Sequence, residues 1–373
     1  MNQLATFPQT ITSAEALSNL SNVPTTVKLV GRALLSAKFG SIQFTFPDGR
    51  QVAFAADQEG PNADLSIHDF AFARKGLAGG DVGFAEAYMD GDWSTTDLTA
   101  VLEYFSANFD ALGGGGLARG QALVRWVNKL RHVFNRNSKK GAKRNILAHY
   151  DLGNDFYEAW LDQSMTYSSA LYTSPNLSLS EAQSEKYEAI CRAMAIKPGD
   201  HVLEIGCGWG GFAEHAALNH DARVTCLTIS DAQATYARDR MKRLGLADKV
   251  EIRIEDYRDH KGAYDGIASI EMFEAVGESY WPSYFSQIKA LLKPGAKAAL
   301  QIITIDNDLF ESYRKRADFI QRYIFPGGML PSERALRNRL KDHDLTLEDA
   351  HYFGLDYAKT LALWKRAFGR EWP

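Results

Sequence analysis

The chain has 373 residues, of which 45% are hydrophobic and 12% aromatic, so it can bury substantial cores and is neither disordered nor fibrous. A formal net charge of -4 and a pI near 6.2 argue against wholesale nucleic-acid binding. No secretory signal pattern opens the chain and no apolar run is long enough to span a membrane, so we expect a cytoplasmic protein whose membrane contact is peripheral, at the inner face.

Residues 1–112 are predicted to form a small α+β domain. The segment SIQFTFPDGRQVAFAA, residues 41–56, alternates apolar and polar residues on both sides of a Pro-Asp-Gly turn, which is typical of a β-hairpin. A glycine run at 113–116 then breaks any regular element and marks a flexible boundary.

Residues 117–144 carry nine Lys or Arg and no acid. Apolar residues recur there at helical spacing opposite Arg125, Lys129 and Arg136, which predicts a basic amphipathic helix. Such a helix suits the surface of an anionic membrane, but it is equally typical of a helix that packs its apolar stripe on the next domain and solvates its charges. Both interpretations stay open at this point.

Residues 145–373 alternate strand and helix patterns. Apolar runs of strand length, HVLEIGC, ARVTCLTI, VEIRI, YDGIASIEMF and AKAALQIIT, are separated by amphipathic stretches. This alternation predicts an α/β fold with a parallel sheet and helices on both faces. The three cysteines have neither disulfide-framework nor metal-knuckle spacing, so we expect free thiols and no metal site.

A glycine-rich turn after the first of these strands is the strongest local motif. Glu204, Gly206, Gly208 and Gly210 give the pattern E-x-G-x-G-x-G. Glycine lets the chain turn sharply and lets a ligand approach the backbone, and a dinucleotide could use the same turn. With its preceding acid the pattern resembles motif I of the class I S-adenosylmethionine-dependent methyltransferases, a Rossmann-like fold.

Two further strand ends agree with that ligand. In LTISDAQ, Thr228 and Gln233 are expected to share the ribose hydroxyls. In EDYRD, Asp256 is expected to accept from the adenine amino group and Tyr257 to cover the ring. Each residue alone is commonly an ordinary turn residue, but three strand ends in agreement favour S-adenosylmethionine.

The segments HYDLGNDFYEAWLDQSMTYSSALY, EIGCGWGG, LTISDAQ, EDYRD, SIEMFEAVG, DFIQRYIFPGGMLPS and HYFGLDYAKTLALW resemble, in order, the signatures of the cyclopropane-fatty-acyl-phospholipid synthases and mycolic acid methyltransferases. The resemblance runs from about residue 145 to 368, with a fainter one before it. It implies transfer of the sulfonium methyl of S-adenosylmethionine to a cis double bond of a phospholipid acyl chain, followed by proton loss that closes a cyclopropane. Membrane phospholipids are the implied partners, and no nucleic acid is expected. Whether the chain forms a homodimer stays open.

The resemblance also implies a bicarbonate base held by a cysteine, a glutamate, a histidine and a tyrosine. Carried over by position, Glu274 matches the glutamate and Tyr357 the tyrosine, while Ser169 replaces the cysteine and Gln301 the histidine. Both replacements keep hydrogen-bonding capacity, so we still expect bicarbonate to bind, although two residues of its site differ.

Glu271 stands where many bacterial members of the family have glycine. Three roles are open for it: a hydrogen bond that supports Gln301, direct acceptance of the proton, or an ordinary carboxylate that caps a helix. If the acceptor has moved, a methyl-branched or methylene-bearing chain replaces the cyclopropane.

The segment from His149 to Asp155 is expected to fold over the cofactor, and Tyr167 and Ser168 are expected to contact its methionine part. Tyr167, Phe273 and Tyr357 are expected to offer aromatic faces to a carbocation. Family members continue with a further aromatic-rich helical segment where this sequence ends at Pro373, and that segment helps to close the catalytic domain and its acyl site, which implies a truncated, weakly active or inactive chain. One alternative function is a small-molecule methyltransferase, against which the basic amphipathic segment and the N-terminal domain count. The other is an inactive lipid-binding homologue, which the Ser169 and Gln301 replacements and the short C-terminus favour.

Overall fold

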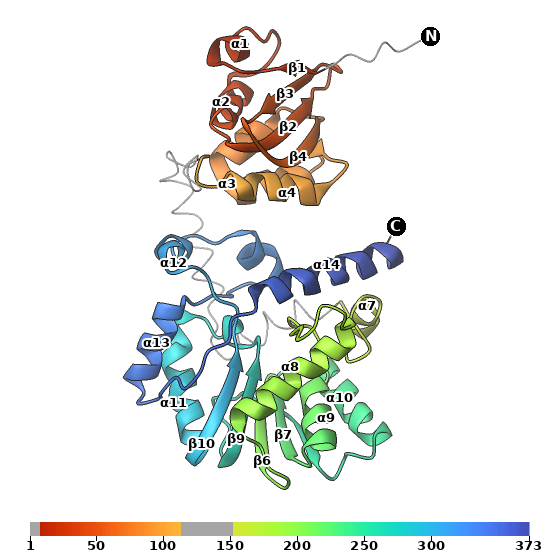
Figure 1. The fold of residues 1–373 in the computed structure, drawn as a ribbon, viewed down its shortest axis with the longest axis vertical. Helices are drawn as coiled ribbons and strands as arrows, with labels where there is room; N and C mark the ends of the chain where they lie inside the picture. Colours follow the sequence, from red (N-terminus) through yellow and green to blue (C-terminus); the bar gives the residue numbers. More distant parts are fainter. Residues whose placement is uncertain (1–7, 113–151, 373) are drawn as a thin grey trace. The chain divides into compact units, whose positions relative to one another are not determined.

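The computed structural model describes residues 8–112 and 152–372. The chain divides into two compact units, Met1–Arg131 and His132–Pro373, and each is described by itself (Figure 1). The predicted basic helix, the glycine run and three residues of the predicted cofactor-covering segment, His149, Tyr150 and Asp151, lie outside the described residues.

In its described residues, 8–112, the first unit is a five-stranded sheet with four helices. The predicted hairpin is present: β2 and β3 pair antiparallel, with Ile42 opposite Phe54, and Gly49 turns the chain between them with φ 82°. The strands, in the order β1-β3-β2-β4-β5 across the sheet, are β1 (Gln9–Thr10), β2 (Phe39–Thr45), β3 (Gln51–Ala55), β4 (Gln58–Ile67) and β5 (Trp93–Ser94). The helices are α1 (Ala14–Ser18), α2 (Thr25–Leu34), α3 (Ala71–Met89) and α4 (Leu98–Ala107).

The second unit is built on a five-stranded sheet in which all neighbours are parallel, in the order β10-β9-β6-β7-β8. Each strand overlaps one of the five predicted apolar runs, because strands covered on both faces need nearly continuous apolar sequence. The last strand begins at Leu292, four residues before the run that predicted it. The strands are β6 (His201–Ile205), β7 (Arg223–Thr228), β8 (Val250–Ile254), β9 (Tyr264–Ile270) and β10 (Leu292–Gln301).

Helices cover both faces of this sheet, as predicted. Alternate strand residues point to opposite faces: Val202 joins a core with α8, α9 and α10, whereas Leu203 joins a core with α11 and α13. The α-helices of this unit are α7 (Asn154–Glu158), α8 (Leu179–Met194), α9 (Gly211–Asn219), α10 (Asp231–Arg243), α11 (Trp281–Leu291), α12 (Asn307–Tyr313), α13 (Glu333–Asp342) and α14 (Gly354–Glu371).

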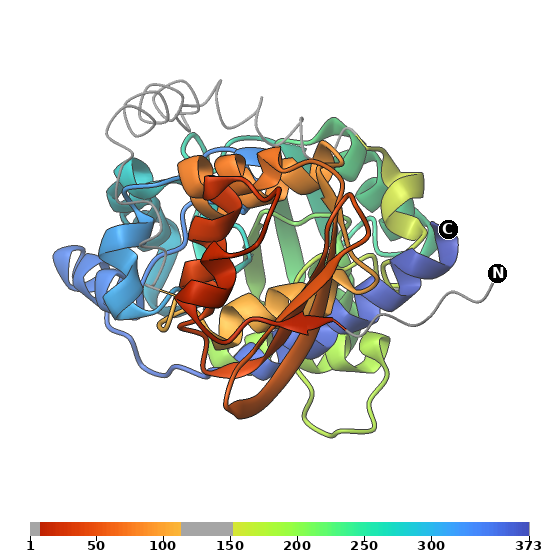
Figure 2. The same cartoon turned by 90° about the horizontal axis from the view of Figure 1, so that it is seen from above.

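The last helix, α14, lies beside α7 in both views (Figures 1 and 2), where Phe156 packs on Phe368 and Trp160 on Trp364. Short helical turns cover Phe273–Ala275, Glu278–Tyr280 and Ile320–Ile324. Among the described residues, no helix combines the length and hydrophobicity needed to cross a membrane. All three cysteines are free and buried, as the sequence predicted.

Candidate active site

The predicted site residues gather at the carboxyl ends of the parallel strands, the edge where ligands bind in open α/β sheets. Five strands each contribute at this edge. Their contributions are Glu204 and the glycine turn after β6, Thr228 at the end of β7, Asp256 and Tyr257 after β8, Glu271 and Glu274 after β9, and Gln301 at the end of β10.

The glycine turn is held against β7 and leaves space beside it. The backbone amides of Gly206 and Cys207 both donate to the carbonyl of Leu227, at 2.9 and 3.1 Å. Gly206 and Gly210 have φ values of 84° and 86°, which L side chains rarely adopt. A Cβ on Gly206 would lie 2.7 Å from the Met272 side chain, whereas a Cβ on Gly208 would meet no atom within 4 Å.

The acid before the turn, Glu204, is only 3% exposed. Its carboxyl group accepts a hydrogen bond from the Cys226 thiol at 3.5 Å. Burial raises the pKa of Glu204 to about 8, a rise that this hydrogen bond and the charges of Arg240 and Lys186 partly offset.

Thr228 and Gln233 lie together, as their expected shared role requires. The Thr228 hydroxyl donates to Gln233 Oε1 at 3.2 Å and accepts from the Ser230 amide at 3.2 Å, and both side chains are buried. The two hydrogen-bonded side chains thus lie next to each other at the carboxyl end of β7.

Asp256 carries a partner that the sequence analysis missed. Both of its carboxylate oxygens accept from the Arg258 guanidinium, at 2.8 and 2.6 Å. The same guanidinium lies 5.7 Å from the centre of the Tyr257 ring and 5.6 Å from that of Tyr280. The sequence EDYRD contains this pair two residues apart, but its spacing does not distinguish a free acceptor from a paired one.

Glu271 lies at the centre of a hydrogen-bonded group. Its backbone is left-handed, with φ 47°. One carboxylate oxygen, Oε1, accepts from the Ser169 amide and from Gln301 Nε2, both at 2.8 Å. The expected hydrogen bond to Gln301 is therefore present, and the carboxylate does not cap a helix. Burial raises the pKa of Glu271, and the charge of Lys186 and these hydrogen bonds partly offset that rise.

Glu274 lies on the short turn three residues later. Its Oε1 accepts from the Ile303 amide, and its Oε2 is buried without a hydrogen-bond partner among the described residues. Burial raises the pKa of Glu274 to about 8, and the negative charge of Glu271 raises it further while the Ile303 amide lowers it. Gln301 Oε1 is likewise buried and unpaired within the described part of the chain. Two buried polar side-chain atoms, Glu274 Oε2 and Gln301 Oε1, thus remain without a partner among the described residues.

Lys186, on α8, is a buried cation that the sequence analysis missed. It is 2% exposed, and its ammonium donates to the Ser168 hydroxyl at 2.6 Å. Burial lowers the pKa of Lys186 to about 7, while the charges of Glu271, Asp162 and Glu204 act in the opposite direction. Its helical position could have indicated that Lys186 is buried, because it lies on the buried face of α8 between Gln183 and Ile190.

Tyr167 and Tyr357 lie in one aromatic cluster with Tyr157, Trp209 and Trp364. The Tyr167 ring centre is 5.4 Å from that of Trp364 and 5.5 Å from that of Tyr157. Burial and the charges of nearby groups hold the pKa of Tyr357 far above its usual range, so its phenol stays neutral.

Phe273 belongs to a different cluster from Tyr167 and Tyr357. It stacks on Trp281 at 5.3 Å and contacts Tyr284 at 5.0 Å, inside the core on the α11 face of the sheet. The structure therefore does not bring the three predicted aromatic faces together.

The described part of the predicted covering segment contacts the glycine turn. Asn154 Oδ1 accepts from the Trp209 indole N–H at 2.9 Å. Arg240, from α10, donates to the carbonyls of Ser164 and Trp209, at 2.7 and 3.4 Å, and pairs with Glu214. One buried guanidinium thus connects the glycine turn to the backbone at Ser164, which lies beyond the predicted covering segment.

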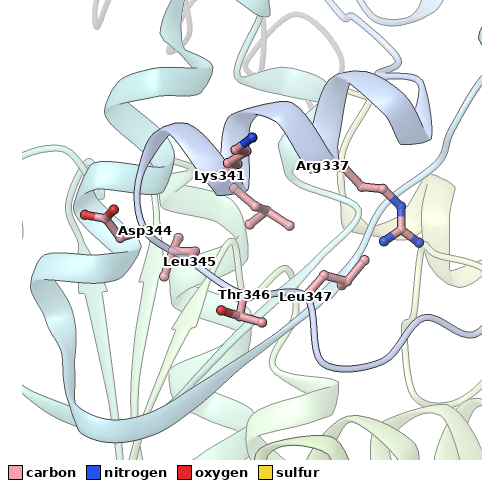
Figure 3. A pocket seen from close by; sticks show the side chains of 7 residues that line it. Arg337, Lys341, Asp344, Leu345, Thr346 and Leu347 are labelled. Atoms are coloured by element: carbon pink, nitrogen blue, oxygen red, sulfur yellow. The ribbon is translucent and has the colours of Figure 1, made fainter.

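A shallow surface pocket at the end of α13 shares no residue with this site (Figure 3). The Arg337 and Lys341 side chains point away from each other there, so they do not converge on one ligand. The pocket is lined by Arg337, Leu340, Lys341, Asp344, Leu345, Thr346 and Leu347.

Comparison with known proteins identifies the family. A family model described as mycolic acid cyclopropane synthetase matches residues 137–373. Tuberculostearic acid methyltransferase UfaA1 of Mycobacterium tuberculosis is 37% identical over 339 residues, covering 88% of this chain and 77% of that protein. Cyclopropane-fatty-acyl-phospholipid synthase of Escherichia coli is 37% identical over 320 residues, covering 83% and 78%.

A solved structure agrees with these relatives. Mycolic acid cyclopropane synthase CmaA1, crystallised with SAH and CTAB, is 29% identical, with a TM-score of 0.56 over 60% of this chain and 82% of that one. The class I methyltransferase fold is shared. The chain belongs to the mycolic acid cyclopropane synthetase family, and it is an S-adenosylmethionine-dependent methyltransferase.

Proposed function

We propose that this enzyme methylates the cis double bond of unsaturated phospholipid acyl chains, with Glu271 as the proton acceptor and a cyclopropane as the product. One observation carries the proposal: a single Glu271 oxygen accepts from both the Ser169 amide and Gln301 Nε2. These are the positions where the family resemblance places the donors to a bicarbonate base.

The glycine turn fits the cofactor. Gly208 leaves open space for a ligand to approach the backbone. We assign the ribose to Thr228 and Gln233, the adenine to Asp256 and Tyr257, and the methionine part to Tyr167, Ser168 and the glycine turn with Glu204. S-adenosylmethionine, when bound, supplies an electrophilic methyl on its sulfonium sulfur.

The residues around Glu271 bind and stabilise the reacting acyl chain. The aromatic rings of Tyr167 and Tyr357 attract the positive charge that develops on one alkene carbon as its neighbour takes the methyl group. The proton then leaves the transferred methyl for a Glu271 carboxylate oxygen, and its C–H electron pair closes the three-membered ring. Ser169 and Gln301 hold that carboxylate in place.

Bicarbonate does not fit this arrangement. The two donors that would hold it already donate to Glu271. Of the unpaired buried atoms that remain, Gln301 Oε1 is an acceptor, and Glu274 Oε2 belongs to a carboxyl group whose pKa burial raises to about 8. The Glu271 carboxylate occupies both donors and repels a second anion beside it, so we replace the expected bicarbonate by Glu271.

A methylene-bearing or methyl-branched chain is the second candidate product. The same observation favours it, because a base in a new place can remove a different proton of the carbocation. The relative named tuberculostearic acid methyltransferase is as similar to this chain, at 37% identity, as the cyclopropane synthase.

The test supplies methyl-labelled S-adenosylmethionine and vesicles of cis-unsaturated phospholipid, with fully saturated vesicles as the control. We expect label in the unsaturated lipid only, and Glu271→Gln should lower the rate by at least about 100-fold. Label on a water-soluble amine but on neither lipid would contradict the proposed substrate. We further propose that the enzyme works from the cytoplasm as a peripheral protein, because its substrate lies in a membrane.

A further inference from the structure

A second group of reactive side chains lies on helices α8 and α9, which pack against each other (Figure 1). Glu188 and Cys191 are one turn apart on α8, His215 lies on α9, and His220 follows the end of that helix. None of the four belongs to the candidate active site.

These side chains converge on one point. The Cys191 thiol and the ring nitrogens of His215 and His220 all lie within 4.8 Å of one another. The same oxygen of Glu188, Oε2, lies 3.3 Å from His215 Nε2 and 2.8 Å from His220 Nε2. One thiol and two imidazoles thus lie close together, and the Glu188 carboxylate contacts both imidazoles.

We propose that Glu188, Cys191, His215 and His220 bind a Zn²⁺ ion. Sulfur, nitrogen and carboxylate oxygen are the ligands that zinc takes in proteins, and four protein ligands form a closed, structural site. Tetrahedral zinc places ligand atoms about 3.3 to 3.7 Å apart. Small rotations of the side chains therefore bring donors that are now within 4.8 Å to coordination distance.

The four side chains differ in how deeply they are buried. Cys191 is fully buried, whereas the side chains of His215, His220 and Glu188 are 12%, 20% and 29% exposed. An ion can enter from the His220 side and reach the thiol at the back of the site. Glu188 also lies 3.8 Å from the Arg192 guanidinium, which offsets part of its charge.

A second partner orients one imidazole. The amide of Asn219 lies 3.1 Å from His215 Nδ1. With its amide oxygen turned toward the ring, Asn219 accepts the Nδ1–H, which leaves His215 Nε2 free to bind the metal. Zinc ligands commonly have such a support.

Zinc at this place would join two helices that serve the active site. Helix α8 carries Lys186, and α9 begins directly after Gly210 of the glycine turn. The ion would stabilise that junction without taking part in methyl transfer. A pair of histidines hydrogen-bonded to a glutamate would serve as a plain helix contact, but such a contact has no use for the thiol.

The experiment uses the full chain, stripped of metal under a thiol-free reductant. Zn²⁺ affinity is measured by competition with a chromogenic chelator, and the Co²⁺ adduct is examined by absorption. We expect one Zn²⁺ per chain, a higher melting temperature with Zn²⁺, and a thiolate-to-cobalt charge-transfer band.

His220→Ala should weaken Zn²⁺ binding by at least about tenfold, since losing even an outer partner costs that much. Cys191→Ser should remove the charge-transfer band, and Cys226→Ser, which changes another buried thiol, should keep it. Equal Zn²⁺ affinity in the wild type and His220→Ala, or a Co²⁺ adduct without the band, would overturn the site. If Cys191→Ser does not fold, His220→Ala decides alone.

Discussion

Glu274 illustrates at the residue scale how burial changes the chemistry of a carboxyl group. Its pKa rises to about 8 because burial and the neighbouring Glu271 both disfavour the charged form. Between about pH 4.5 and 8 the folded chain therefore keeps a proton that the unfolded chain releases. Stability should fall as pH rises through that window, by about 1.4 kcal/mol per pH unit for each such group.

Glu204 has the same raised pKa and adds to this fall, whereas the lowered pKa of Lys186 gives the opposite trend only above about pH 7. Urea unfolding at pH 5, 6 and 7 should show the fall in the wild type. Glu274→Gln should reduce the slope by about 1.4 kcal/mol per pH unit. The exposed Glu158→Gln is the control, and an unchanged slope in Glu274→Gln would show that its carboxyl group is not protonated in the fold.

Among the structural elements, the glycine turn allows the effect of backbone strain to be distinguished from the effect of filling the space for the ligand. Gly208 has φ 51° and open space beside it, and so does Gly245, at φ 67°, after α10. Gly208→Val should weaken S-adenosylhomocysteine binding by at least about tenfold, because the side chain fills the space that the ligand needs. Gly245→Val carries similar strain and should bind normally in a calorimetric titration. Equal affinities would remove Gly208 from the cofactor site.

Helix α14 holds the loop that carries Ser169. The Ala170 amide donates to Thr360 Oγ1 at 3.1 Å, and the Tyr172 amide donates to Asp356 Oδ2 at 2.9 Å. Both contacts fix the backbone next to the Ser169 amide, one of the donors to Glu271.

Thr360→Val keeps the shape of the side chain and leaves the buried Ala170 amide unpaired. We expect a loss of about 1 to 3 kcal/mol in the free energy of unfolding, together with slower methyl transfer. Thr235→Val is the matched control, because its hydroxyl bonds only to the Asp231 carbonyl on an exposed helix face. A Thr360→Val variant as stable as this control would exclude the proposed support.

The sequence predicts the elements of this fold well because each carries its own periodicity. The five parallel strands lie on five apolar runs, and the hairpin lies on its Pro-Asp-Gly turn. Contacts between distant elements are different. No local pattern indicates that Lys186 reaches Ser168, or that Phe273 packs under α11.

The residues of the candidate site could be predicted only where they lie at strand ends or at positions that the family resemblance indicates. Glu271 and Gln301 are 30 positions apart, but Glu271 directly follows β9 and Gln301 ends the adjacent parallel strand β10, so their contact could be expected. The group formed by Cys191, His215 and His220 could not, because its members meet only through the packing of α8 on α9.

For the whole molecule, the open question is whether the basic segment 117–144 binds the membrane surface. This segment lies outside the described residues. Changing Arg125, Lys129 and Arg136 together to Glu should weaken binding to anionic vesicles, because each basic residue near such a surface contributes about 1 kcal/mol. Co-sedimentation checks this, with neutral vesicles as the control. Unchanged binding would favour the alternative, a helix packed on the protein.

The measurement that tests the central claim most directly follows methyl transfer to cis-unsaturated phospholipid in bicarbonate-depleted buffer. The left-handed backbone at residue 271 suits glycine, so Glu271→Gly should fold while losing the carboxylate. We expect full wild-type activity without bicarbonate, loss of activity in Glu271→Gly, and recovery of that variant when bicarbonate is added. A wild type that itself needs bicarbonate, or a Glu271→Gly variant as active as the wild type in the depleted buffer, would contradict the role of Glu271 as the proton acceptor.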